Sequence, residues 1–224
     1  MDWPALRLSL RLAGCTTIIL LILGTPLAYW LAVTRRKWKF IVEAVVALPL
    51  VLPPTVLGFY LLMATGPRSL LGKTYQNVFS GTLPFSFQGI LLASILYSLP
   101  FAVQPLASAF SGVDRRWVEA SWCLGVSRIA TFFRVILPLS LSGVVTAVVL
   151  CFAHTLGEFG VVLMVGGNLP GATRTLSIAI YDDVQALNYE SAARASLLLL
   201  TISFLTLLVT YSLRKKAGGL WPMN

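Results

Sequence analysis

Two ionisable residues whose spacing could support chemistry lie inside one long apolar segment. His154 and Glu158 are four residues apart, so a helix would place both on one face. One histidine and one carboxylate supply too few ligands for a metal site, and no nucleophile stands beside a base. We therefore expect no metal, no cofactor and no enzyme active site. Glycines at 157 and 160 predict a helix break, where Glu158 accepts backbone N–H groups with His154 as its candidate partner. Gating of a transport pathway is the alternative role.

A second candidate is Arg174, which threonines flank on both sides in a polar segment. The planar guanidinium group matches a tetrahedral oxyanion well, so Arg174 could contact an anion at a gate. An ion pair with Asp182 or Asp183 is the alternative, and the sequence favours neither.

The charged segment 111–138 predicts two short helices at an angle. Asp114 suits the N-cap of a helix over 115–124, because its carboxylate accepts backbone N–H groups and is favoured by the helix dipole. Gly125 suits the left-handed position after that helix, and Ser127 suits the cap of a second one, which runs to a proline. A docking element for a partner and an ordinary amphipathic connector are both possible uses. The apolar side chains offered to a partner are Val118, Trp122 and Ile129.

Prolines interrupt another apolar segment at Pro49, Pro53 and Pro54. Proline removes a backbone hydrogen bond and kinks a helix. In a membrane, such a break is tolerated where packing or a water-lined cavity compensates. We expect a broken helix beside a translocation pathway, with Thr55 and Gly58 facing it. Simple kinking for packing is the alternative.

The elements that position these residues are predicted to be membrane helices. Hydrophobic residues make up 57% of the 224 residues and charged residues only 11%, against about 25% charged in ordinary soluble domains. Runs of about 20 apolar residues predict spanning helices. We expect one all-α transmembrane domain over residues 1–224. Its five predicted spans are residues 12–33, 41–64, 87–110, 139–165 and 195–213.

The net charge of +9 predicts an orientation rather than a nucleic-acid partner, because the basic residues border the apolar runs. Segments 34–40 and 111–138 each contain four of the 17 lysines and arginines, and residues 214–216 contain three. The positive-inside rule places these eleven in the cytoplasm, with the N-terminus outside and the C-terminus inside.

Three shorter segments are also expected to be structured. Residues 3–11 could form an interfacial helix on either side of the membrane, and residues 70–79 one that lies flat outside. Apolar residues at helical spacing predict an amphipathic helix over 175–188 at the outer surface. These residues are Leu176, Ile180, Val184 and Leu187.

The charged segment resembles a loop of ABC importer permeases, whose pattern is EAA, three residues, G, nine residues, then I-x-LP. The matching residues here are Glu119, Ala120 and Ser121, then Gly125, and finally Leu137 and Pro138. Ser121 replaces the second alanine and Val135 the isoleucine. The resemblance implies a type I importer permease fold, in which this loop forms a coupling helix that docks in a cytoplasmic ATPase.

Three further stretches resemble the molybdate permease subunits, within a wider group for molybdate, tungstate and sulfate. They are residues 48–54 with Gly58, residues 157–160 and residues 167–175. The resemblance implies two cytoplasmic ATP-binding subunits, a periplasmic molybdate-binding protein and the bacterial inner membrane. Because five helices enclose little space, we expect a homodimer with the pathway on its axis.

The sequence contains no GxxxxGK[ST] motif, so we expect ATP hydrolysis in a partner subunit. Tungstate and sulfate are the alternative substrates, because tetrahedral oxyanions of similar size are not separated by these motifs. An ATP-independent channel and a secondary transporter are the remaining alternatives. The second would normally show more spans and internal repeats.

Overall fold

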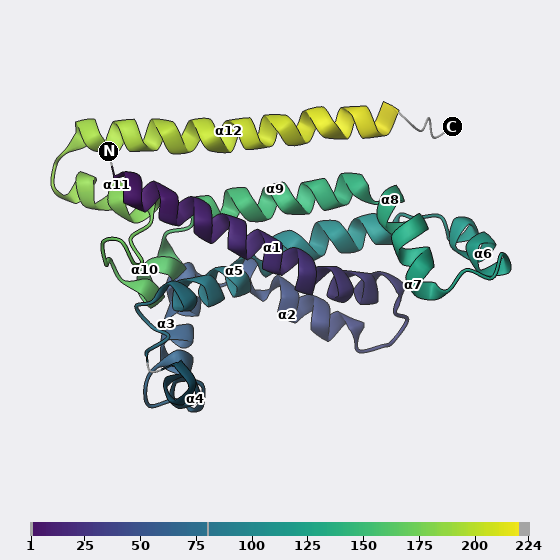
Figure 1. Cartoon of the computed structure of the whole chain (residues 1–224), viewed down its shortest axis with the longest axis horizontal. Helices are drawn as coiled ribbons and strands as arrows, with labels where there is room; N and C mark the ends of the chain where they lie inside the picture. The colour runs from purple at the N-terminus through teal and green to yellow at the C-terminus, as the bar shows by residue number, and fades with distance from the viewer. Residues whose placement is uncertain (1, 80, 220–224) are drawn as a thin grey trace.

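The computed structural model describes residues 2–79 and 81–219, and every regular element in these ranges is a helix. The longest helices run alongside one another in an elongated bundle (Figure 1). Helix α5 (Phe87–Ser111) packs against both α1 (Trp3–Val33) and α9 (Leu141–Gly157). Val103 and Leu106 of α5 lie fully buried in the resulting core. The all-α class predicted from the composition is confirmed.

Helix α1 begins at Trp3, because Asp2 caps it by accepting a hydrogen bond from the Ala5 N–H at 3.0 Å. Residues 3–11 are therefore the first turns of the span, and the predicted separate interfacial helix is wrong. Apolar side chains continue into this region, with Leu6 and Leu8 buried, so the helix has no reason to stop before Arg11.

The second predicted span is broken into α2 (Lys39–Val51) and α3 (Pro54–Thr65), which meet at an angle of 111°. Leu52 precedes a proline and adopts an extended ψ of 135°, as pre-proline residues prefer. Pro54 then starts the next helix, where its missing N–H costs nothing. The predicted break is confirmed, but its size rules out one continuous helix over 41–64.

The fourth predicted span is also divided. Helix α9 ends at Gly157, and a separate helix α10 (Gly160–Gly166) follows. At its other end α9 meets the helical arm Arg128–Leu139 at 75°. The break predicted at Gly157 and Gly160 is present, because the backbone of Glu158 is extended and ends α9. The extent of the membrane span over 139–165 stays a prediction.

The two segments predicted to lie outside form helices α4 (Leu70–Phe79) and α11 (Leu176–Gln185). The apolar face predicted for α11 is only partly right. Leu176 is buried in a cluster with residues of α1 and α12 (Tyr189–Gly219), whereas Val184 is exposed. Leu187 lies beyond α11 and has a φ of +58°. Helix α11 thus packs against α1 and α12 by its buried face. Its predicted place at the outer membrane surface stays a prediction.

Three described helices are long and apolar enough to cross a membrane, and each bent pair could add one more, giving up to five. Figure 1 shows the α1–α2 connection, the short helices α6 (Arg115–Cys123) and α7 (Arg128–Thr131), and the C-terminal end of α12 at one end of the bundle. The three basic segments therefore lie at the same end of the bundle. This is the arrangement on which the predicted orientation depends.

Candidate functional site

Helix α6 forms as its capping residues predict. The Arg116 backbone N–H donates to the Asp114 carboxylate at 2.9 Å, and the Arg116 guanidinium lies 2.8 Å from the same carboxylate. These hydrogen bonds from Arg116 hold the pKa of Asp114 below its ordinary value. The helix begins at Arg115, directly after this cap.

Helix α6 ends in a Schellman motif at Gly125, whose φ is +77°. The Gly125 N–H donates to the Trp122 carbonyl at 2.9 Å, and the Val126 N–H donates to the Ser121 carbonyl at 3.1 Å. Nothing lies within 4 Å of where a Cβ on Gly125 would sit. The backbone angle alone therefore favours glycine here.

Helix α6 and the helical arm Arg128–Leu139 form a hairpin that turns at Gly125. The second arm of this hairpin changes its helical pitch along its length. Ser127 caps α7, a π-helical turn η1 (Phe132–Ile136) follows, and α8 (Leu137–Leu139) leads to α9. Pro138 cannot donate a hydrogen bond to the carbonyl four residues earlier, and the Leu137 N–H bonds Phe132, five residues back. The matched Leu137 and Pro138 thus lie where the arm turns into the span.

A buried hydrogen bond joins the two arms. The hydroxyl groups of Ser121 on α6 and Thr131 on α7 lie 2.9 Å apart, and both side chains are buried. The sequence analysis did not predict this contact. The presence of Ser121 where the family pattern has alanine could have pointed to it.

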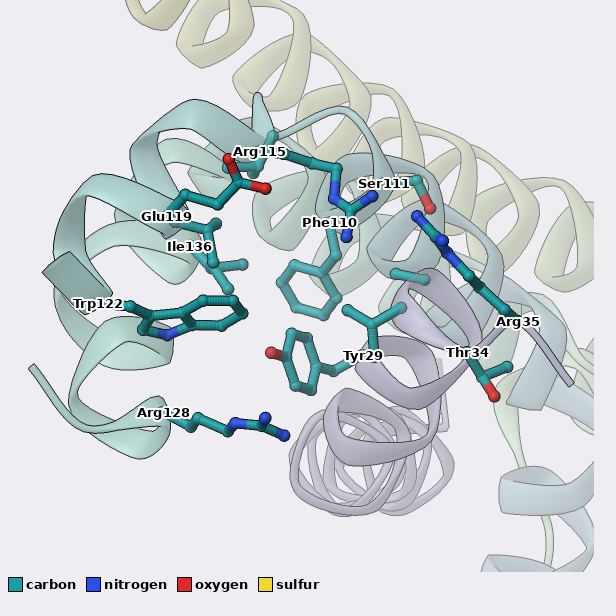
Figure 2. Close-up of a pocket in the computed structure, with 14 residues that line it drawn as sticks. Tyr29, Thr34, Arg35, Phe110, Ser111, Arg115, Glu119, Trp122, Arg128 and Ile136 are labelled. Atoms are coloured by element: carbon teal, nitrogen blue, oxygen red, sulfur yellow. The ribbon is translucent and has the colours of Figure 1, made fainter.

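The hairpin presents its side chains in two directions. Figure 2 shows Glu119 and Trp122 beside a cavity between α6 and the ends of α1 and α5. Val118 packs against the core, so the apolar docking surface predicted for Val118 and Trp122 is partly turned inward. Ala120 is exposed, and Ile129 is 74% exposed beside a groove between α1 and the second arm.

The break after α9 is held by Glu158, as predicted. Its Oε1 atom accepts a hydrogen bond from the Val161 N–H at 2.9 Å, and the side chain is only 8% exposed. His154 is not its partner: the Nδ1 atom lies 2.9 Å from the Ser98 hydroxyl, and the ring stacks on Phe101. Because α9 ends at Gly157, the extended backbone of Glu158 leaves the helical face that His154 occupies.

Helices α3 and α10 approach closely through glycines. A Cβ on Gly160 would lie 2.7 Å from the Pro54 Cβ, and one on Gly58 would lie 2.6 Å from the Met164 Cβ. Pro54, Gly58 and Glu158 are thus brought together around α10. Pro53 and Thr55 are exposed on the described chain, and the role of all five in translocation stays a prediction.

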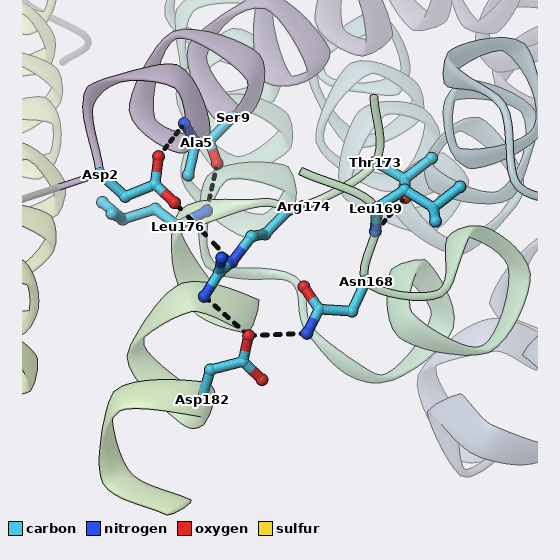
Figure 3. Close-up of polar contacts among 9 residues, drawn as sticks. All are labelled: Asp2, Ala5, Ser9, Asn168, Leu169, Thr173, Arg174, Leu176 and Asp182. Atoms are coloured by element: carbon cyan, nitrogen blue, oxygen red, sulfur yellow. Dashed lines mark hydrogen bonds and ion pairs between the residues drawn. The ribbon is translucent and has the colours of Figure 1, made fainter. Parts of the chain in front are cut away.

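Arg174 forms the ion pair that the sequence offered as an alternative. Its Nη2 atom lies 2.8 Å from Asp182 Oδ2, which also accepts a hydrogen bond from Asn168 at 2.6 Å. Its Nε atom lies 3.7 Å from Asp2 Oδ2 (Figure 3). Leu176 donates from its backbone to the Ser9 hydroxyl beside this cluster. Arg174 therefore joins Asp2, at the start of α1, to Asp182 within α11.

Known proteins resemble this chain along almost its whole length. Residues 24–217 match the family model of the binding-protein-dependent transport system inner membrane component. The chain belongs to this family. The molybdenum transport system permease protein ModB of Azotobacter vinelandii is 51% identical over 219 residues, which cover 98% of this chain and 97% of the relative. ModB of Escherichia coli (strain K12) is 36% identical over 222 residues, covering 97% of each chain.

Two solved structures show the same fold as this binding-protein-dependent transport component. A bacterial ABC transporter for import of the polysaccharide alginate gives a TM-score of 0.76 at 16% identity, over 95% of this chain and 78% of that one. The MetNI methionine ABC transporter gives a TM-score of 0.74 at 19% identity, over 95% of this chain and 94% of that one.

Among residues 2–79 and 81–219 of this family member, no three His, Cys, Asp or Glu side chains are grouped as metal ligands.

Proposed function

We propose that this chain is the membrane-spanning permease subunit of an ATP-driven importer that moves molybdate across the bacterial inner membrane. The observation that supports this most directly is the identity of 51% to a molybdenum transport permease over nearly the full length of both chains. The segment of α6 and α7 adds support, because its N-cap at Asp114 and its turn at Gly125 are those expected of a coupling loop.

The working complex that we propose is a homodimer of this chain with two cytoplasmic ATP-binding subunits and a periplasmic molybdate-binding protein. ATP binding would close the two ATP-binding subunits and move the coupling hairpins, and hydrolysis would reset them. Glu119, Ala120 and Gly125 would belong to the docking element. The exposed Pro53 and Thr55 would face the dimer axis.

We infer a route through the chain from the hairpin toward the opposite end of the bundle, where α10 and α3 meet. Movement of α6 would pass through the Ser121–Thr131 hydrogen bond to η1 and then into α9. At its far end α9 meets the capped break at Glu158, and α10 packs against α3 through Gly160. Rigid helices joined by such close contacts can transmit a displacement over their length.

The experiment is reconstitution of the chain with its ATP-binding subunit and binding protein in liposomes. We expect molybdate uptake that requires ATP, the ATP-binding subunit and the binding protein together. Uptake without ATP would indicate a channel or secondary transporter and would contradict the proposal. Competition by excess tungstate and sulfate would rank the oxyanions, and preferred uptake of sulfate would replace molybdate as the substrate.

A further inference from the structure

The cavity behind α6 is lined by more positive than negative charge. It has a volume of about 410 Å³, within the range of roughly 300–1,000 Å³ found for small-molecule sites. Arg35, Arg115 and Arg128 line it together with one carboxylate, Glu119. Figure 2 shows Arg35 and Arg115 pointing toward one another on one side of Tyr29, and Arg128 on the other side. None of the three arginines forms an ion pair within residues 2–79 and 81–219.

An apolar groove of about 700 Å³ adjoins this cavity and shares Tyr29, Val33 and Arg128 with it. The groove follows the outer face of α1 and is closed on its other side by the hairpin arm, where Phe133 is 60% exposed. Ile22 on α1 is 66% exposed in the same groove. A cationic cavity thus opens directly into an apolar channel that lies along a membrane span.

We propose that this pair of sites binds one anionic phospholipid of the cytoplasmic leaflet. The phosphate group occupies the cavity among Arg35, Arg115 and Arg128, and an acyl chain lies in the groove between Ile22 and Phe133. Arginine suits this role because its guanidinium group binds phosphate oxygens in a fork and is readily taken out of water. The predicted orientation places basic side chains at the level of that leaflet.

The bound lipid connects the coupling hairpin to the spans. Arg115 belongs to α6 and Arg128 to α7, whereas Arg35 follows α1. A phosphate between Arg35 and Arg115, which point toward one another, neutralises both charges and so holds α6 against the end of α1. Arg128, on the other side of Tyr29, adds positive charge where the cavity meets the groove. Glu119 faces the same cavity and opposes the anion, which leaves a net attraction of three cations against one carboxylate.

Binding is tested on the purified full chain in a neutral detergent. Phosphatidylglycerol, phosphatidylcholine or soluble glycerol phosphate is added, and bound lipid is counted by native mass spectrometry while the melting temperature is followed. We expect one retained phosphatidylglycerol per chain and a rise in melting temperature with that lipid alone. Equal effects of phosphatidylcholine would overturn the proposal. Equal effects of glycerol phosphate would replace the lipid with a free anion.

Two kinds of variant separate the head-group and acyl-chain parts. Arg35→Gln, Arg115→Gln and Arg128→Gln should each weaken phosphatidylglycerol binding about fivefold, as expected for one basic side chain near an anionic head group. Arg68→Gln removes the same charge from an exposed position at the outer end and should have no effect.

Ile22→Trp fills the groove and should reduce lipid retention. Leu200→Trp changes an equally exposed apolar residue on α12, 66% in both cases, and should not. Unchanged binding in the arginine variants and in Ile22→Trp would refute the site.

Discussion

The hydroxyl groups of Ser121 and Thr131 lie 2.9 Å apart between α6 and α7, although Thr131 follows Ser121 by ten residues in the chain. Both side chains are buried, with 7% and 1% exposed. Each hydroxyl would be left without this partner if the other were removed, and an unpaired buried hydroxyl is costly. The hydrogen bond therefore fixes the angle between α6 and α7, through which a moving partner would act on α9.

This contact predicts a coupling free energy in a double-mutant cycle. Ser121→Ala and Thr131→Val should each lower the free energy of unfolding by about 1 kcal/mol. The double variant should lose less than the sum, because the second substitution removes no further hydrogen bond. Unfolding in a detergent titration measures all three. Thr146→Val is the control, since its hydroxyl bonds a carbonyl of its own helix, and strict additivity in the cycle would contradict a shared bond.

Gly125 should be needed for its backbone angle and not for space. Gly125→Ala should cost about 1–2 kcal/mol, because a Cβ is unfavourable in the left-handed region. Gly14→Ala is the matched control: nothing lies within 4 Å of its Cβ position either, but it sits within α1. That change should be neutral or stabilising. We expect only Gly125→Ala to weaken association with the ATP-binding subunit in co-purification, and the same outcome for both variants would contradict this role.

Glu158 should act through its hydrogen bond and not through its charge. Glu158→Gln keeps an oxygen that can accept from the Val161 N–H, so stability and uptake should change little. Glu158→Leu leaves that buried N–H unpaired and should cost about 1–3 kcal/mol. Thermal unfolding and proteoliposome uptake are measured for both. If Glu158→Gln abolished uptake while the protein stayed folded, a charge-dependent role in gating would be the better explanation.

Arg174 should stabilise the end of the bundle where α1 begins. Arg174→Gln leaves Asp2 and Asp182 without their shared cation and should lower the melting temperature. Restoring neutrality with Asp182→Asn should recover part of the loss. If Arg174 also contacts the transported anion, the KM for uptake should rise severalfold in Arg174→Gln and stay high in the double variant. An unchanged KM with reduced stability would leave the ion pair as its only role.

Membrane orientation can be tested with reporter fusions. The charge distribution predicts that a reporter active only in the cytoplasm gives signal when fused after residue 224, which lies outside the described residues. The same reporter inserted at Asn77 in α4 should be silent. The opposite pattern would reverse the orientation and remove the phospholipid site from the cytoplasmic leaflet.

The sequence by itself determined the features that depend on neighbouring residues. Asp114, Gly125 and Ser127 define the hairpin because a cap or a left-handed turn needs only the next few residues. The break at Pro53 is local in the same way, and so is the capping role of Glu158. The apolar runs determined that the chain is helical and membrane-embedded.

Only the tertiary structure decided how these elements meet. His154 bonds Ser98, which is 56 residues away, because α5 packs against α9. The close approach of Gly160 to Pro54 and the cavity shared by Arg35 and Arg115 join segments that no periodic pattern connects. Such contacts depend on which helices pack together and at what angle. Side-chain spacing along the sequence does not contain that information. The bends of 111° and 75° set the direction of whole helices, and nearby residues do not specify these angles.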